Sequence, residues 1–139
     1  MSGSCSAGYE PAYADSNGNV AYGPFTPGKP HGYVVIAGTR YAPAASYQLT
    51  LTNTGSATAQ VTGFVVAFYD AGGSELGSDQ QTFDTPTYLT AGQSLSWTEF
   101  SGTDTIGNGL SGDGGTGNQD SSIPPSGFAT CQLVEWLHP

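Results

Sequence analysis

Residues 61–70 of this 139-residue chain read VTGFVVAFYD, the longest apolar run in the sequence. The run is rich in β-branched and aromatic side chains, which suit a pleated surface, and its length suits a strand better than a helix. Successive side chains of a strand point to opposite faces, and here both faces are apolar. One face would carry Phe64, Val66 and Phe68, and the other Val65, Ala67 and Tyr69. We therefore expect a central strand that is covered on both sides.

Shorter strand signals, separated by glycine-rich turns, surround this run. Residues 47–52 and 95–97 alternate between apolar and polar side chains, and residues 128–137 form an apolar closing strand. A weak strand over residues 78–83 is expected to end before Pro86. The alternation predicts a core that contains Leu49, Leu51, Phe64, Val66, Phe68, Leu95, Trp97 and Val134. Because no segment has a helical period, the sequence predicts an all-β, antiparallel β-sandwich of about seven strands.

The chain length fits one domain with a single core. Residues 1–30 are rich in proline, glycine and tyrosine, and we expect them to form an irregular N-terminal arm that packs on the domain. Residues 31–139 would form the β-sandwich. Within it, residues 101–126 have the composition of a polar, glycine-rich loop, and loops of this length are often functional or mobile.

The charge of the chain is strongly acidic. Eleven acidic side chains face two basic ones, Lys29 and Arg40, which gives a net charge of −9. Such a surface repels a phosphate backbone and an anionic membrane surface, so we exclude nucleic acid as a partner. No apolar stretch approaches the roughly 20 residues that span a bilayer, so we expect no membrane insertion.

The chain has two cysteines, Cys5 and Cys131, at its opposite ends. They lack the close spacing and the companion ligands of a zinc site. They would form a disulfide in an oxidising compartment, or stay as two free thiols in the cytosol; we favour the disulfide. The first four residues contain no hydrophobic signal region. A signal peptide is therefore either absent or already removed. The scarcity of lysine, the abundance of Ser, Thr, Gly and Asn, and the two cysteines favour removal, so we expect a secreted or cell-envelope protein.

Aromatic residues are the first candidates for ligand binding. Four of them lie in the N-terminal arm: Tyr9, Tyr13, Tyr22 and Phe25. Their rings could stack on sugars or fill the groove of a partner, as aromatic side chains do at binding surfaces. The alternative is that they cover the edge of the sandwich.

The glycine-rich loop contains the candidate metal ligands. Five oxygen-bearing side chains lie in it: Asp104, Asn108, Asp113, Asn118 and Asp120. Calcium takes oxygen ligands from loops of this kind, although the spacing is not that of an EF-hand. The alternative is a solvated loop with no cofactor.

The sequence does not favour catalysis. No Gly-x-Ser-x-Gly motif follows a predicted strand, and Cys131 lies within a strand. Residues 31–34, HGYV, are similar to the amino terminus of copper-dependent polysaccharide monooxygenases. That chemistry needs a free amino-terminal histidine, whereas thirty residues precede His31, and His138 is the one other histidine. A secreted polysaccharide-active enzyme is therefore the least favoured function.

Three segments resemble known extracellular modules. Residues 49–56, 66–73 and 89–94 together resemble an immunoglobulin-like module of the FxLYD type found in bacterial envelope proteins. The name-giving pattern would fall on residues 66–70, where Tyr69 and Asp70 match by identity. The resemblance covers about residues 33–100. It implies an immunoglobulin-like fold, and that family has no common catalytic residue to carry over.

A second similarity is to the sandwich modules that bind cellulose and chitin. They too have an Asn-Thr-Gly-Ser turn before a long central strand, as at residues 53–56, and cysteines near both ends. Those modules usually expose a line of tryptophans, whereas Trp97 and Trp136 fall in strands that we expect to be buried. The sequence thus favours a non-catalytic module that binds a polysaccharide or a surface protein. The alternative is a structural or assembly domain that docks to a partner subunit through its N-terminal arm or an edge strand.

Overall fold

The computed structural model describes residues 1–30, 32–101, 118–120, 122–124 and 126–139. These residues form β-strands and the turns and loops between them. The strands are β1 (Ser2–Glu10), β2 (Ala12–Ala14), β3 (Val20–Tyr22), β4 (Thr26–Pro27), β5 (Val34–Ile36), β6 (Thr39–Tyr41), β7 (Ala44–Thr52), β8 (Ala59–Tyr69), β9 (Glu75–Leu89), β10 (Ser94–Ser101), β11 (Asn118–Asp120) and β12 (Thr130–Leu137). Within these ranges no helix has the length and apolar character needed to cross a membrane.

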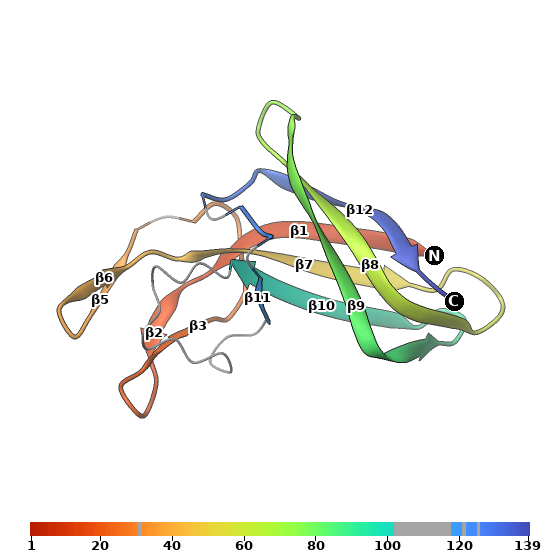
Figure 1. Cartoon of the computed structure of the whole chain (residues 1–139), viewed down its shortest axis with the longest axis horizontal. Coiled ribbons are helices and arrows are strands. Elements are labelled where there is room, and N and C mark those ends of the chain that lie inside the picture. Colours follow the sequence, from red (N-terminus) through yellow and green to blue (C-terminus); the bar gives the residue numbers. More distant parts are fainter. Residues whose placement is uncertain (31, 102–117, 121, 125) are drawn as a thin grey trace.

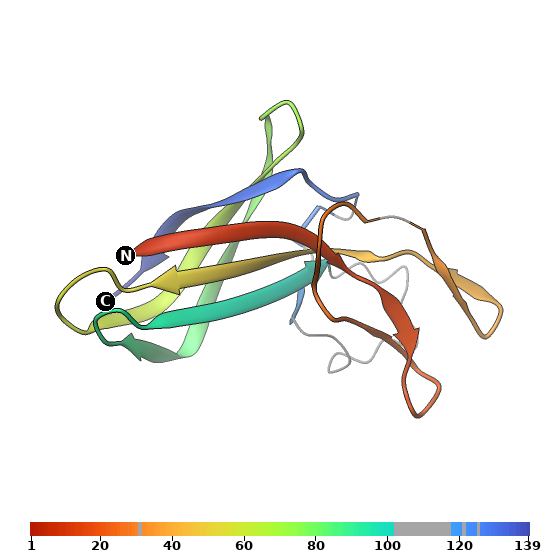
Figure 2. The ribbon, with the colours of Figure 1, turned by 180° about the vertical axis from the view of Figure 1, so that it is seen from behind.

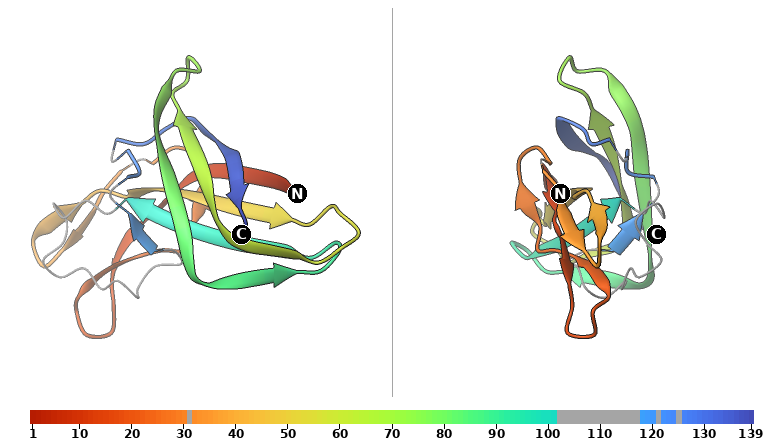
Figure 3. Two further views of the ribbon diagram at one scale, coloured as in Figure 1. Left: turned by 45° about the vertical axis from the view of Figure 1, so that its right-hand side comes forward. Right: turned by 90° about the vertical axis from the view of Figure 1, so that its left-hand side faces the viewer.

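Two main sheets face each other. One has the order β11-β10-β7-β1-β4 and the other β12-β8-β9, and all pairs are antiparallel except β10–β11. Figures 1 and 3 show β8 and β9 crossing in front of β1, β7 and β10. Residues of both sheets share one core. The all-β prediction is confirmed, and the arrangement is consistent with a β-sandwich.

The central strand lies where the sequence places it. Strand β8 pairs with β9 on one side and β12 on the other. Its residues Phe64, Val66 and Phe68 are fully buried, as are Leu49 and Leu51 of β7 in the facing sheet. On the opposite face of β8 the apolar residues are buried or half-buried, so the cover there is partial.

One predicted core residue is misplaced. Leu95 and Trp97 are half-buried and pack against the core, but Val134 is 58% exposed. The register of β12 against β8 shifts between Leu133 and Glu135. Val134 is the extra residue of this bulge, and a bulge interrupts the simple alternation of faces. The expectation that Val134 lies in the core is therefore wrong.

The expected disulfide is confirmed. Cys5 of β1 and Cys131 of β12 are bonded, with their Cα atoms 5.6 Å apart. Because the two strands belong to different sheets, the bond links the sheets covalently.

The expectation of an irregular N-terminal arm is wrong for residues 2–10. Strand β1 pairs with β7 along its whole length, from Ser2 opposite Thr52 to Glu10 opposite Ala44. Its small residues carry little hydrophobic alternation, so the pattern does not indicate a strand. They nevertheless fit the structure, because an added Cβ on Gly3 would collide with the side chain of Leu133.

Strand β9 runs through the position where a break was expected. Gly63 of β8 lies opposite Thr82 and Val61 opposite Thr87, so the chain bulges between these two partners. Pro86 falls in this bulge, on an edge strand. No ladder hydrogen bond is required from it there, which is why the strand continues past proline.

Two hairpins form the end of the molecule that is opposite to both termini. Strands β2 and β3 form one, and β5 and β6 the other (Figures 1 and 2). The first packs Tyr22 against Phe100 of β10 in a small second core. The second turns at Ala37 and Gly38, whose φ values are 50° and 82°. Positive φ at both central residues is typical of the tight turns that match strand twist.

Candidate binding site

Three tyrosines surround a hollow at the hairpin end. Tyr9 comes from β1, Tyr33 directly precedes β5, and Tyr41 ends β6. The hollow has a volume of about 210 Å³ and is completed by Pro11, Ala12, Gly32, Val34 and Pro43. Tyr33 is 54% exposed, whereas Tyr9 and Tyr41 are half-buried. Rings held at different depths around one hollow can contact a ligand from more than one side.

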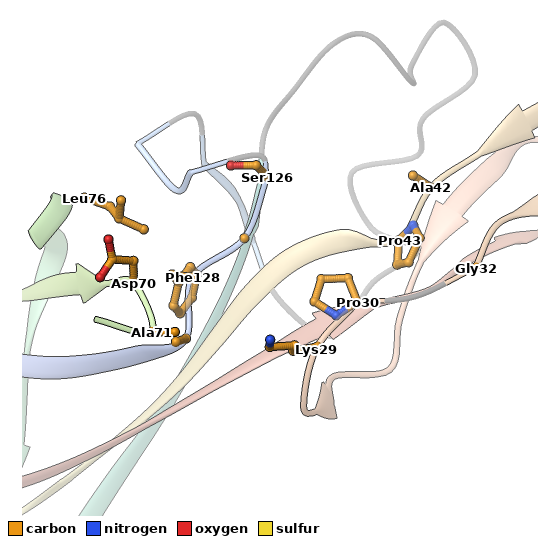
Figure 4. A pocket seen from close by; sticks show the side chains of 12 residues that line it. Lys29, Pro30, Gly32, Ala42, Pro43, Asp70, Ala71, Leu76, Ser126 and Phe128 are labelled. Carbon is orange, nitrogen blue, oxygen red and sulfur yellow. The ribbon is translucent and has the colours of Figure 1, made fainter. Parts of the chain in front are cut away.

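A second, larger cavity adjoins the first. It has a volume of about 540 Å³ and lies between the hairpin end and the turn that joins β8 to β9 (Figure 4). Asp70, Leu76 and Phe128 lie toward one end of it, and Pro43 and Gly32 toward the other. The two cavities share Gly32 and Pro43. We call them together the tyrosine groove.

Both basic side chains of the chain lie at this groove. Lys29 lines the larger cavity, and the Arg40 guanidinium lies 4.5 Å from the centre of the Tyr33 ring. The carboxylate of Asp70 accepts hydrogen bonds from the backbone N–H groups of Gly72 and Ser74, each at 2.9 Å. Asp70 therefore stabilises the turn after β8 while it lines the groove.

The four aromatic residues proposed from the sequence do not form one surface. Tyr9 lines the groove, whereas Tyr13 is 40% exposed on β2 and lines neither cavity. Phe25 is half-buried, and its ring lies close to Gly8. Tyr22 is buried and stacks on Phe100 with 5.7 Å between ring centroids, so its ring is closed to a ligand.

Tyr33 and Tyr41 are the groove residues that sequence reasoning missed. Residues 33–37 have the composition of a short strand, and this composition does not indicate that Tyr33 lies at a binding surface. The available signal was the shortness of the run and the Ala-Gly turn after it, which together indicate a hairpin rather than a member of a main sheet.

The phenol of Tyr22 is chemically unusual. Burial raises its pKa well above the ordinary value for tyrosine, and the nearby Tyr41 adds to the increase. Its hydroxyl has no hydrogen-bond partner among the residues that the structure describes. Tyr22 thus belongs to the packing of the hairpin end rather than to the ligand surface.

Besides Glu10, two carboxylates are buried among the described residues, those of Asp79 and Glu99. Asp79 Oδ2 accepts hydrogen bonds from the Tyr47 hydroxyl at 2.7 Å and from Gln81 Nε2 at 3.0 Å. Glu99 Oε1 accepts one from Trp97 Nε1 at 2.6 Å. The Tyr47–Asp79 bond joins β7 to β9 across the core. Neither carboxylate lines the tyrosine groove, so we assign both a structural role.

The calcium prediction stays a prediction. Asp104, Asn108 and Asp113 lie outside the described residues, as do the side chains of Asn118 and Asp120. His31, the candidate copper ligand, lies outside them too. In the part of the chain that is described, no three His, Cys, Asp or Glu side chains are grouped so that they could hold a metal ion.

Comparison of the chain with protein-family models, with curated proteins and with solved structures finds no match.

Proposed function

We propose that this chain is a non-catalytic, secreted β-sandwich module that binds a polysaccharide in the tyrosine groove. The observation that carries the proposal is the convergence of Tyr9, Tyr33 and Tyr41 on one hollow, at the end of the molecule away from both termini. A tyrosine ring offers an apolar face for the C–H face of a sugar and a hydroxyl for its polar rim. Binding sites commonly combine such walls with a few polar groups.

The strand order supports an immunoglobulin-like sandwich, which is the fold that the FxLYD resemblance implies. Counting the six longest strands in chain order, the first, second and fifth (β1, β7, β10) share one sheet, and the third, fourth and sixth (β8, β9, β12) share the other. This matches strands A, B and E against C, C′ and F of the immunoglobulin fold. The disulfide departs from that fold, because it joins the equivalents of A and F. Fold alone implies no ligand.

A disulfide between distant parts of the chain supports secretion, since such bonds persist in oxidising compartments. The groove also differs from the sugar-binding faces that expose a line of tryptophans. Trp97 packs between Phe64 and Phe83 in the core, and Trp136 packs on His138. Tyrosines take the place of tryptophans in the site that we propose.

Affinity electrophoresis through gels that contain single soluble polysaccharides tests the proposal. We expect at least one neutral or sparsely charged polysaccharide to retard the protein, and Tyr33→Ala to weaken this retardation about tenfold. Tyr88→Ala is the matched control, because Tyr88 is 62% exposed and lies far from the groove. The carbonyl of its neighbour Leu89 accepts a hydrogen bond from Asn53, and the next residue, Thr54, binds the N-terminal ammonium. The proposal fails if no polysaccharide retards the protein, or if both variants lose retardation equally.

The second candidate is assembly by strand addition, and one observation favours it. Within the described residues β4 pairs with β1 at Gly8 and Tyr9 alone, so no strand is paired with residues 2–6 of β1 on that edge, although β12 packs close to β1. Exposed edges without charge are templates for pairing with another chain. The N-terminal segment itself is built into the sheet, so its deletion would remove a strand rather than a docking arm.

Light scattering tests this second candidate. Assembly through β1 predicts a dimer or larger species that becomes monomeric when Ser4 and Ser6 are both replaced by Lys. Both serines are exposed, so the variant should keep its melting temperature. A wild-type protein that stays monomeric as its concentration rises excludes this candidate.

A further inference from the structure

We propose that the tyrosine groove recognises a carboxylate-bearing sugar residue in an otherwise neutral polysaccharide, with Arg40 receiving the carboxylate beside the ring of Tyr33. The inference rests on the proposed function and adds the class of sugar to it. It is carried by the placement of the positive charge and by the geometry of one residue pair.

The positive charge of this acidic chain is concentrated at the groove. The chain has eleven acidic and two basic side chains. Lys29 lines the larger cavity of the groove together with Asp70, and Arg40 lies against Tyr33, which lines the smaller cavity. The N-terminal ammonium, by contrast, lies at the opposite end, where it donates to Thr54 Oγ1 at 3.1 Å. Asp70 offsets the charge of Lys29 at the larger cavity, so a ligand with a negative group is favoured at the Tyr33 side of the groove, where Arg40 lies.

The Arg40 side chain is available to such a group. It is exposed, and no carboxylate of the described residues forms an ion pair with it. Its guanidinium lies over the Tyr33 ring, with 4.5 Å between its central carbon and the ring centre. An arginine held against a ring keeps the N–H groups of its guanidinium available, and their planar fork matches the two oxygens of a carboxylate. A sugar that contacts the edge of Tyr33 would bring its carboxylate to this fork.

The net charge sets an upper limit on the charge of the ligand. A polymer with a carboxylate on every residue would be repelled by a protein of net charge −9. A polymer in which such residues are separated by neutral sugars avoids most of this repulsion, because salt screens charges beyond about 10 Å. We therefore expect the groove to select sparse rather than dense carboxylates.

Chemically matched polysaccharides test the inference. The probes are glucuronoxylan and gellan, which both carry isolated glucuronate residues, each used before and after reduction of its carboxyl groups to alcohols. We expect at least one of them to bind about tenfold more tightly in its acidic form. Arg40→Gln should lower that affinity to the level of the reduced form, and should leave the affinity for the reduced form unchanged. Arg40→Lys, which keeps the charge but loses the planar fork, should fall between the two.

Other outcomes separate this inference from the proposed function. If acidic and reduced forms bind equally and Tyr33→Ala weakens both, the groove binds polysaccharide but the carboxylate inference is wrong. It is also wrong if Arg40→Gln leaves the preference for the acidic form intact, or if polygalacturonate, a dense carboxylate polymer, binds most tightly. If none of these polysaccharides binds in either form while a neutral one does, the proposed function stands without the inference. Binding to no polysaccharide at all overturns both.

Discussion

Replacing Tyr22 by Phe should stabilise the protein. The ring is buried and stacks on Phe100, and the substitution keeps that ring. It removes a hydroxyl that has no hydrogen-bond partner within the described residues. A buried, unsatisfied polar group costs about 1–3 kcal/mol, so we expect a gain of about 1 kcal/mol at neutral pH. For a chain of this size that gain corresponds to a melting temperature about 3–5 °C higher.

The gain should increase at alkaline pH. Burial raises the pKa of Tyr22 in the folded state, whereas a tyrosine in the unfolded chain ionises near pH 10. The stability that the neutral phenol provides is therefore complete below about pH 10 and falls as the pH rises above it, by up to about 1.4 kcal/mol per pH unit. Tyr22→Phe removes this dependence, so its advantage over the wild type should grow between about pH 10 and pH 11.

Denaturant melts at neutral pH and near pH 11 measure both effects, and Tyr47→Phe is the matched control. The Tyr47 hydroxyl donates to buried Asp79, so its removal should destabilise the protein by about 1.5–3 kcal/mol. The same Tyr→Phe substitution should therefore increase the free energy of unfolding at position 22 and decrease it at position 47. The reasoning is refuted if Tyr22→Phe destabilises by more than about 1 kcal/mol at neutral pH, or if its advantage does not grow with pH.

Three further substitutions test the fold by denaturant melts. Phe68→Ala should cost about 3–5 kcal/mol, because Phe68 is fully buried and contacts the rings of Tyr47 and Phe128; a loss below about 1 kcal/mol would contradict its place in the core. Gly63→Ala should cost about 1–3 kcal/mol, because the new methyl group would meet the backbone oxygen of Gln81; an unchanged melt would contradict this close approach of β8 and β9. Replacing Cys5 and Cys131 together by Ser should cost about 2–5 kcal/mol, and free thiols in the oxidised wild type would contradict the bond itself.

The main sheets could be predicted where burial follows the period of a strand. Residues 47–52 alternate, and Leu49 and Leu51 are buried as that alternation indicates. Residues 61–69 are apolar on both faces, and they form the middle strand of their sheet. In both cases the polarity of each side chain indicates whether it faces the core or the solvent, so the sequence is sufficient to predict the strand and its buried face.

The sequence does not predict the structure where a bulge interrupts the alternation of faces along a strand. It also fails where the side chains of a strand are too small to show an alternation of apolar and polar residues. The bulge between Leu133 and Glu135 depends on how β12 pairs with β8, and no local sequence pattern predicts it. Strand β1 is held by backbone pairing with β7 and by the bond at Cys5, while most of its side chains are small. Pairing of this kind is a property of two distant segments, so neither segment reveals it alone.

The groove is harder to predict than the core, because its parts come from separate segments. Tyr9 lies on β1, in a segment for which the sequence predicts no regular structure. Tyr33 and Tyr41 lie at the two ends of the β5–β6 hairpin, which joins neither main sheet. The prediction that aromatic side chains of residues 1–30 bind a ligand stays a prediction, and of the four residues named for it Tyr9 lines the groove. Tyr9 and the hairpin come together only in the tertiary structure, so no periodic pattern in the sequence indicates that they lie side by side.

The β5–β6 hairpin exposes an apolar and a basic side chain, and it holds one residue other than glycine at positive φ. Val35 is 60% exposed, Arg40 has no carboxylate partner among the described residues, and Ala37 has a φ of 50°. A positive φ at a residue other than glycine costs on the order of 1 kcal/mol, and exposed apolar side chains contribute little to stability. All three residues lie within seven residues of Tyr33. The tight turn accounts for the φ of Ala37, and the exposed Val35 and Arg40 are consistent with the ligand site that we propose at the hairpin end.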